Sequence, residues 1–492
     1  MKRYRLHIWP VWLLLGMMFL AACQSDALPG EDLGGGKPIV ARSDSSYINL
    51  RIVGNSQAIT RATFSDYATA AENAVYDGIL CIFEGTDETS AILKTAVYID
   101  QLINNPGTTA NSQTLNVTQH LSIGKLSAVT DQHRYVLALL NTTSTGFKVS
   151  GNDLLFDGTS QANKTISQIQ NLQIHSVGSI DKHVGLFMSN APQTGYIMPE
   201  AAALFNTEAE AQAEGAARVT INVERAAARV KMISDIQSGD VISNISLYDG
   251  DNDNTNNPKA KFHKMTWTIN KYNIHSYAIR KGSTATNNWA EDFNYTSAPE
   301  KTYTAWDFNL YPQKSYSGDD IYIGENTTET PTSEDNVTEV IVEVQLKDNN
   351  NMLMHECFKF NYVGELITSS AQYFNHMMNG WNLQRSNYGS LVYREAAEVF
   401  KYGTIEIKDN GDVDITLKND SFDDTEKADL KILENKLEGW TRGYRDGKMY
   451  YTYKIKHSDT QYGVVRNNAY NLNFTSVPAI GDPVPTPIVV TP

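Results

Sequence analysis

Short segments with the pattern of β-strands recur along most of this 492-residue chain, and they constrain its fold more than any other feature. In residues 47–53 (YINLRIV), apolar and polar side chains alternate, as expected for a strand with one buried face. Residues 340–346 alternate in the same way, and residues 75–85 have the character of a fully buried strand. Because Asn, Asp, Gly and Ser turns separate these segments, the sequence predicts a mostly β fold built of β-sandwiches.

The remaining elements follow from the same patterns. Further strands are expected at 134–142, 183–190, 219–234, 450–457 and 469–477. Residues 404–418 predict a hairpin around Asn410-Gly411, and the turn at 348–351 should pair strand 340–346 with residues 354–362. A Glu- and Ala-rich patch after Pro199 predicts a short helix.

One longer helix is expected near the C-terminus. Thr425 is the predicted N-cap, and Gly439 the predicted end. Leu430, Leu433 and Leu437 form an apolar stripe at helical spacing between them. This stripe indicates that one face of the helix packs against the β structure.

The N-terminus has the pattern of a lipoprotein signal. Three basic residues precede a 13-residue apolar run that ends in Leu20-Ala21-Ala22-Cys23. A spanning helix needs about 20 apolar residues, so this run is too short, and a cleavable secretory signal over residues 1–22 is expected. Cys23 then stands where bacterial lipoproteins carry diacylglycerol and palmitate, and two acyl chains suffice for stable anchoring.

Composition excludes several classes of protein. The net charge is −15, and it becomes −18 without residues 1–22, which argues against a nucleic-acid partner. Only Cys81 and Cys357 remain once Cys23 is lipidated, and both are expected to be buried free thiols. The sequence contains no H-E-x-x-H, zinc-spaced Cys/His, G-x-S-x-G, P-loop or G-x-G-x-x-G motif. We therefore predict no catalytic residue, cofactor or metal.

Three segments together resemble the fimbrillin family of Bacteroidales, the type V pilin lipoproteins. The first is the lipobox, followed by strand 47–53, a polar loop and strand 75–85. The second is VTINVERAAARVKM at 219–232. The third is YYTYKIKHSDTQYGVVRNNAYNLNFTSV at 450–477, whose core GVVRNNAY (463–470) is the most specific match. The phrasing of this last segment is most similar to the major subunit of the short (minor) fimbriae.

The resemblance implies a division of the chain. The fold would be two transthyretin-like or Greek-key β-sandwich domains in tandem, with a few short helices. The expected parts are a signal peptide (1–22), a tether with the first strand that is removed on maturation (23–61), an N-terminal domain (62–217), a C-terminal domain (218–477) and an extended tail (478–492).

The family's maturation implies a cleavage after an arginine by an external arginine-specific protease. Arg42 precedes strand 47–53, Arg51 lies inside it, and Arg61 follows it in a stretch of small and polar residues. Cleavage between Arg61 and Ala62 would release the whole strand together with the lipid, so this position is favoured. The apolar side chains of Ile48, Leu50 and Ile52 would then leave a groove that another subunit fills.

The tail is the candidate donor of the replacing strand. It holds five of the 15 prolines, which keep it extended, and its last apolar residues are Ile488, Val489 and Val490. The implied function is a structural fimbrial subunit that supports adhesion and biofilm formation. Its expected partners are copies of itself and other fimbrial subunits, the protease, outer-membrane lipid and a host or bacterial surface receptor. A fimbrial tip or accessory adhesin, a glycan-binding surface lipoprotein and, more weakly, a surface hydrolase stay open as alternatives.

Overall fold

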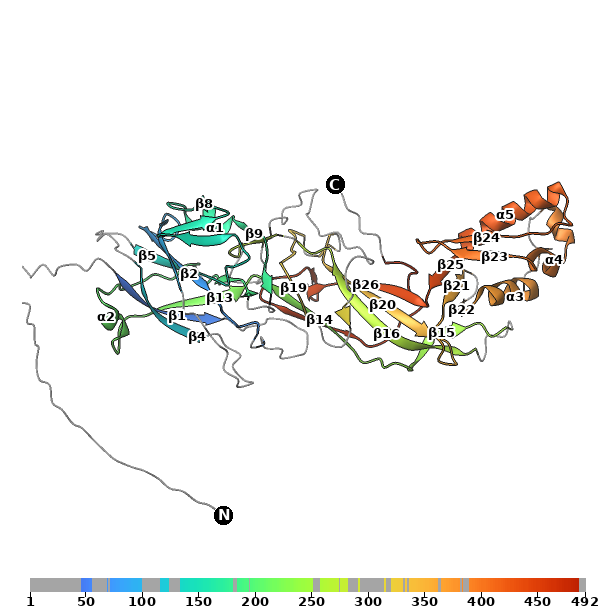
Figure 1. Cartoon of the computed structure of the whole chain (residues 1–492), viewed down its shortest axis with the longest axis horizontal. Coiled ribbons are helices and arrows are strands. Elements are labelled where there is room, and N and C mark those ends of the chain that lie inside the picture. The colour runs from blue at the N-terminus through green and yellow to red at the C-terminus, as the bar shows by residue number, and fades with distance from the viewer. Residues whose placement is uncertain are drawn as a thin grey trace, which may run out of the picture. The chain divides into compact units, whose positions relative to one another are not determined.

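The computed structural model describes residues 46–54, 69, 71–99, 116–123, 133–179, 184–193, 195–250, 257–273, 275–281, 291–292, 314–315, 320–330, 332–333, 336–361, 364–380, 383 and 389–485. Within them, β-strands in several sheets dominate and helices are few and mostly short, so the expected mostly β class is confirmed (Figure 1).

A seven-stranded sheet organises the N-terminal part. Its order is β3-β2-β5-β12-β13-β1-β4. The strands are β1 (Tyr47–Gly54), β2 (Gly78–Gly85), β3 (Ile92–Tyr98), β4 (Asn116–Ser122), β5 (His133–Leu140), β12 (Met188–Asn190) and β13 (Val219–Arg225). Its members come from both ends of the N-terminal half, so the sheet forms only when residues about 170 positions apart pair.

Both faces of this sheet are covered. Leu80 and Ile82 of β2 enter one apolar cluster, whereas Ile79, Cys81 and Phe83 enter the other. This explains why β2 is buried along its whole length. The second face carries β6 (Phe147–Ser150), β7 (Asp153–Phe156), β8 (Thr159–Ser160) and α1 (Ile166–Gln170), followed by the short strands β9 (Gln173–Ile174), β10 (Gly178–Ser179) and β11 (Gly185–Leu186).

Two sheets pack face to face in the C-terminal part. The smaller has the order β19-β14-β29, from β14 (Ala228–Ser234), β19 (Asp320–Ile323) and β29 (Ala469–Phe474). The larger runs β25-β21-β22-β15-β16-β20-β26, from β15 (Val241–Leu247), β16 (Lys259–Asn270), β20 (Glu339–Lys347), β21 (Glu356–Phe360), β22 (Glu365–Ile367), β25 (Thr441–Arg445) and β26 (Lys448–Lys454), with β18 (Lys314–Ser315) beside β16. Val230, Trp267 and Val342 share one core between them.

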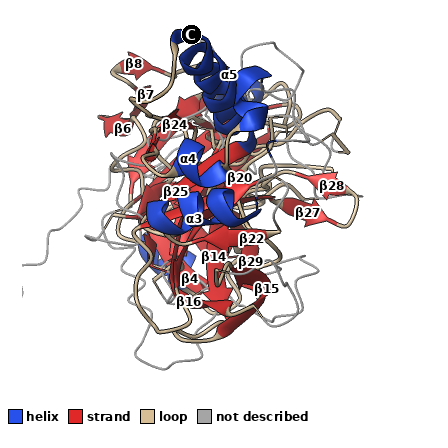
Figure 2. Cartoon of the chain, turned by 90° about the vertical axis from the view of Figure 1, so that its right-hand side faces the viewer, coloured by secondary structure: helices blue, strands red, loops and turns tan. Residues whose placement is uncertain are grey.

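A helical region continues from the larger sheet. It comprises α3 (Ser370–Gly380), η2 (Gly389–Tyr393), α4 (Ala396–Phe400), α5 (Asp424–Trp440) and the hairpin of β23 (Thr404–Ile407) and β24 (Val413–Thr416). Figure 2 shows α3, α4 and α5 gathered together against the strands. The elements share a core that includes Phe400 and the predicted stripe Leu430, Leu433 and Leu437. The remaining short elements are α2 (Glu208–Gln212), β17 (Ser276–Tyr277), β27 (Lys456–Ser458) and β28 (Gln461–Tyr462).

Several local predictions are confirmed. The alternating segment at the N-terminus forms β1, the hairpin around Asn410-Gly411 forms β23 and β24, and the patch after Pro199 contains α2. The expected cap of the long helix is wrong, since Asp423 is the N-cap and forms a capping box with Glu426. The carboxylate of Asp423 accepts a hydrogen bond from the backbone amide of Glu426 at 2.8 Å, so the helix begins two residues earlier than a cap at Thr425 would allow.

Two predicted strand arrangements are also wrong. Segment 219–234 is not one strand, because it bends at Ala226-Ala227 and passes from the N-terminal sheet to the smaller C-terminal sheet. Strand 340–346 forms β20, but it pairs with β16 and β26 rather than with the segment that follows the turn. Both edges of β20 are occupied by strands distant in sequence, so β21 pairs with β22 and β25 instead.

Candidate functional site

The predicted site residues divide between described and undescribed parts of the chain. Cys23, Arg61, Ala62 and the candidate donor residues Ile488, Val489 and Val490 lie outside the described residues. The displaced-strand residues Ile48, Leu50 and Ile52 lie inside them, on β1. The candidate site is therefore built from β1 and the elements that hold it.

Strand β1 occupies an interior position in its sheet. It pairs in parallel with β13 from Leu50 to Gly54, and antiparallel with β4 from Tyr47 to Val53 (Figure 1). At its start, Tyr47 and Phe205 exchange two backbone hydrogen bonds of 2.8 Å. Removal of β1 would therefore leave a slot with unpaired backbone groups on both sides, rather than a shortened edge.

The apolar side of β1 is completely enclosed. Ile48, Leu50 and Ile52 are each 0% exposed, and they share a core with Ile221 and Val223 of β13. Full burial of such a side chain contributes about 1.5–3 kcal/mol relative to exposure. The three side chains therefore supply most of the apolar free energy with which β1 is held.

One residue on the polar side of β1, Asn49, is also enclosed, which alternation alone did not predict. Asn49 is only 2% exposed. Its side-chain oxygen accepts a hydrogen bond from Arg218 Nε at 3.2 Å, and its amide donates to the carbonyl of Ala216 at 3.4 Å. The segment that follows α2 thus covers this face, so the slot recognises one polar side chain as well as three apolar ones.

The chain that follows the predicted cleavage position is anchored at a second place. Thr69 and Glu72 form a tight turn through their side chains. Glu72 is 3% exposed and pairs with Arg229 of β14 at 3.3 Å, while Asn73 accepts a hydrogen bond from Arg225 at 3.1 Å. Loss of β1 would therefore leave Glu72 and Asn73 tied to residues 225–229, the crossover at which the chain passes from the N-terminal sheet to the smaller C-terminal sheet.

The 463–470 motif lies at the same crossover. Arg466 is 0% exposed, donates to both carboxylate oxygens of Glu325 at 3.0 and 2.5 Å, and reaches the carbonyl of Tyr277 at 2.7 Å. Beside this pair, Arg280 donates to Glu224 at 3.0 Å, and burial raises the pKa of Glu224. A bidentate, buried arginine pair fixes geometry more than it adds stability.

The asparagines of the motif bind the crossover backbone. Asn467 has a φ of +60° and donates its amide to the carbonyl of Ala227 at 2.8 Å. The carbonyl of Asn468 accepts from the amide of Arg229 at 2.9 Å. The hydroxyl of Tyr470 accepts from the amide of Val465 at 2.8 Å, which closes the loop on itself. The motif is therefore a structural latch, a role that its sequence alone did not indicate.

The first residues of the tail lie along the edge of β26. Tyr450 and Asp482 exchange two backbone hydrogen bonds of 2.9 and 3.0 Å. Tyr451 and Tyr444 donate their hydroxyls to the carbonyls of Ala479 and Gly481 at 2.7 and 3.0 Å. The tail thus adds one bridge, Tyr450 with Asp482, beside β26 of the larger C-terminal sheet.

Other residues that could carry chemistry are unreactive or already serve the fold. Cys81 and Cys357 are buried free thiols, and burial raises the pKa of each far above its usual value. No group of three or more His, Cys, Asp or Glu in the described part of the chain could hold a metal ion. In the same residues, no helix combines the length and apolarity needed to cross a membrane.

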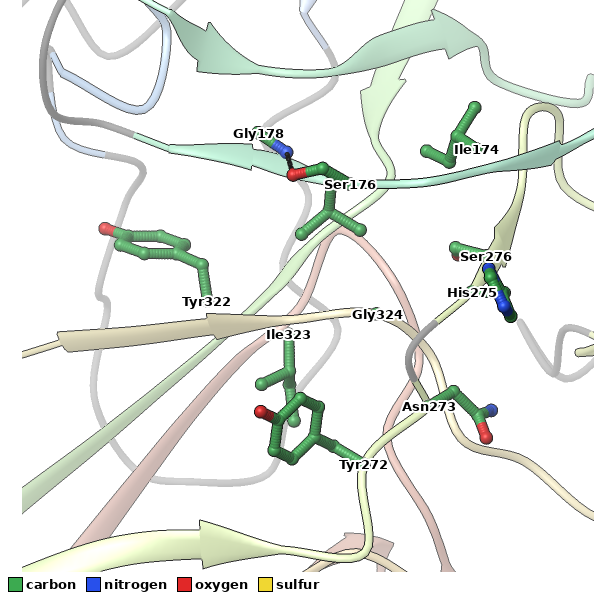
Figure 3. A pocket seen from close by; sticks show the side chains of 11 residues that line it. Ile174, Ser176, Gly178, Tyr272, Asn273, His275, Ser276, Tyr322, Ile323 and Gly324 are labelled. Carbon is green, nitrogen blue, oxygen red and sulfur yellow. Dashed lines mark hydrogen bonds between the residues drawn. The ribbon is translucent and has the colours of Figure 1, made fainter. Parts of the chain in front are cut away.

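One cavity of about 290 Å³ lies where residues 174–178 meet residues 272–276 and 322–324 (Figure 3). Tyr272 and Tyr322 line it. Asn273 already donates to Asp292 and to the carbonyl of Glu325, both at 2.7 Å. Its amide thus serves the surrounding fold, and the cavity is not assigned to a ligand.

Residues 442–490 match the family described as major fimbrial subunit protein type IV, fimbrillin, C-terminal. This segment contains β26, the 463–470 latch, β29 and the tail contacts with β26. This C-terminal segment is therefore similar to the fimbrillins. The resemblance expected from the sequence is confirmed, whereas kinship to the major subunit of the short fimbriae stays a prediction.

The chain is also similar to solved structures at low identity. One is a fimbrial assembly protein from Parabacteroides distasonis ATCC 8503, with 13% identity, a TM-score of 0.31 and coverage of 63% of this chain and 87% of that one. Another is the tip fimbrial protein Mfa3 from Porphyromonas gingivalis with C-terminal truncation, with 10% identity, a TM-score of 0.25 and coverage of 61% and 80%. No curated protein matches the sequence.

Replacing Arg466 with Ala should destabilise the fimbrillin-matched segment strongly. The change leaves Glu325 buried without its guanidinium partner, and the loss of one member of a buried pair lowers the free energy of unfolding by about 3–5 kcal/mol. Urea unfolding measures the effect. Arg442→Ala, which removes a half-exposed pair with Asp412, is the control and should change the midpoint much less. Equal losses for both variants would contradict the latch.

Acidification should weaken the fold through His457. Burial, together with repulsion from Arg280, lowers the pKa of His457 to about 4 from 6.5. Between these values the unfolded chain binds a proton that the folded chain does not, so stability should fall as the pH drops from 6.5 toward 4. His457→Asn cannot titrate and should show a flatter dependence of the urea midpoint on pH. A dependence as steep as that of the unaltered chain would refute this assignment.

Proposed function

We propose that this chain is a structural subunit of a bacterial surface fimbria, exported as a lipoprotein precursor, cleaved after an arginine and polymerised by donor-strand exchange. The observation that carries the proposal is the interior position of β1, whose three apolar side chains are fully enclosed. The match of residues 442–490 to the fimbrillin C-terminal family supports it. Such a polymer would serve adhesion and biofilm formation, with copies of the chain, other fimbrial subunits and a surface receptor as partners.

Export and anchoring rest on the N-terminal sequence. The basic start, the short apolar run and Leu-Ala-Ala before Cys23 support a lipidated precursor in the outer membrane. The lipid and β1 belong to the same 39-residue segment, 23–61, because Arg61 is the first arginine after the strand. A single cut there would free the subunit from the membrane and vacate the slot together.

The arrangement of β1 discriminates among the three arginines. Arg51 lies in the middle of β1, with ladder partners Thr220 on one side and Thr118 on the other. A protease needs an accessible, extended segment, so cleavage at Arg51 would require β1 to leave first. Cleavage after Arg42 would leave β1 in place. These points favour Arg61, with Ala62 as the first residue of the mature chain.

The spacing of enclosed side chains on β1 defines what the donated strand must supply. Ile48, Leu50 and Ile52 lie at alternate positions on one side of the strand. A strand that replaces β1 needs the same spacing, because successive side chains point to opposite faces. In the tail, Ile488, Val490 and Pro492 satisfy it, whereas Val489 would face the side that holds Asn49. Two aliphatic side chains and a proline would therefore fill the slot.

A tip or accessory subunit is the alternative function. It is favoured by the tail contacts with β26, since Asp482 is paired within its own chain. Such a subunit would accept a strand, or keep its own, without donating one. The tyrosines around the cavity give no comparable support to a glycan-binding function.

Arg61→Ala should prevent maturation. The surface form should retain residues 23–61, remain lipidated and fail to polymerise, whereas Arg51→Ala should mature normally because its position is enclosed by two ladders. Mass spectrometry of the N-terminus and SDS-resistant ladders from sheared cells provide the measurement. If Arg61→Ala still gave the normal mature form, cleavage would have to occur at another site.

Substitutions in the tail should show which face of the donated strand enters the slot. Ile488→Asp and Val490→Asp place a carboxylate in an apolar slot, where an unpaired charge is strongly unfavourable, and they should abolish SDS-resistant ladders. Val489→Asp is the matched control and should retain them. Ladders lost equally in all three variants would show that the alternate register is wrong.

A further inference from the structure

The contacts at the start of the tail have the properties of a permanent attachment. β26 is the last strand of the larger C-terminal sheet, and β20 occupies only one of its edges. On the other edge, the backbone pairing of Tyr450 with Asp482 extends the ladder by one more strand position. An open strand edge is a template for unwanted pairing, and the tail covers this one.

The hydroxyls of two tyrosines, one on β26 and one on β25, also bind the tail. Tyr451 of β26 donates to Ala479, and Tyr444 of β25 donates to Gly481. Tyr444 is 2% exposed, so its hydroxyl has little alternative contact with water. By contrast, the hydroxyl of Tyr450 donates to Glu343 at 2.9 Å.

Glycine and proline make the fit specific. A Cβ on Gly481 would lie 2.8 Å from the carbonyl oxygen of Tyr450 and from the ring of Tyr451, so only glycine permits this approach. Pro483 lies against Gly411 of the β23–β24 turn, where a Cβ would collide with its ring. Ile480 packs against the core shared by the two C-terminal sheets. Residues 479–483 are thus held from the backbone, from the side chains and from the neighbouring hairpin.

We propose that residues 479–483 are a fixed root from which the donor segment leaves, and that this root stays on its own sheet in the assembled polymer. The proposal rests on strand donation by the tail as the proposed function.

Hydrogen exchange of the purified full chain tests the root before any assembly. The amide of Asp482 should exchange slowly, and Tyr444→Phe with Tyr451→Phe should accelerate it by roughly two- to tenfold for each hydroxyl removed. Tyr453→Phe is the matched control, because Tyr453 lies on β26 with 49% of its surface exposed and should leave the rate unchanged. An Asp482 amide that exchanges as fast as an unfolded segment would overturn the proposal.

Hydrogen exchange of two truncated variants and of the assembled polymer completes the test. Deleting 486–492 should leave the exchange at Tyr450 slow, whereas deleting 478–492 should accelerate it at least tenfold, because only the longer deletion uncovers β26. In polymers of the unaltered chain, Asp482 should stay protected, and loss of that protection on assembly would refute the fixed root. Polymers formed without residues 486–492 would refute strand donation instead, while slow exchange at Tyr450 in that variant would still support the root.

Discussion

Strand β1 lies between a parallel neighbour and an antiparallel one, and the continuity of the N-terminal sheet depends on it. β4 reaches the rest of the sheet only through β1, since the order ends β13-β1-β4. A strand in this position satisfies backbone groups on both sides and fills the core with three enclosed side chains, Ile48, Leu50 and Ile52. Any event that removes it must be matched by the insertion of another strand, or the sheet loses both ladders at once.

The crossover between the two parts of the chain provides the complementary rigid element. Glu72, Arg225 and Arg229 tie the segment after the predicted cleavage position to it, and Arg466 and Asn467 of the C-terminal motif close it from the other side. Of these, the charged side chains of Glu72, Arg229 and Arg466 are buried and paired, an arrangement that specifies geometry while adding little net stability. It would allow β1 to be exchanged without loosening the frame around the slot.

Local sequence patterns predicted the positions of the strands and helices better than they predicted which strands pair. Alternation located β1, and the Asn-Gly turn located the β23–β24 hairpin, because both signals act over a few residues. The sequence did not predict the pairing of β20 with β26 or the bend at Ala226-Ala227. Both depend on which strand, distant in sequence, lies at each sheet edge. The burial of Asn49 was missed for the same reason, since the segment that covers it lies about 170 residues away in the chain.

The sequence by itself determined the strand content, the three apolar positions of β1 and the resemblance of the C-terminal segment to the fimbrillins, because these reside in residue type and spacing. The tertiary structure decided that β1 is an interior strand, that the 463–470 motif is a latch and that the tail begins on the edge of β26. Each of these depends on contacts between residues far apart in the chain, such as Arg466 with Glu325 and Tyr450 with Asp482. Such contacts have no local signature, because they arise only when the chain has folded and brought distant residues together.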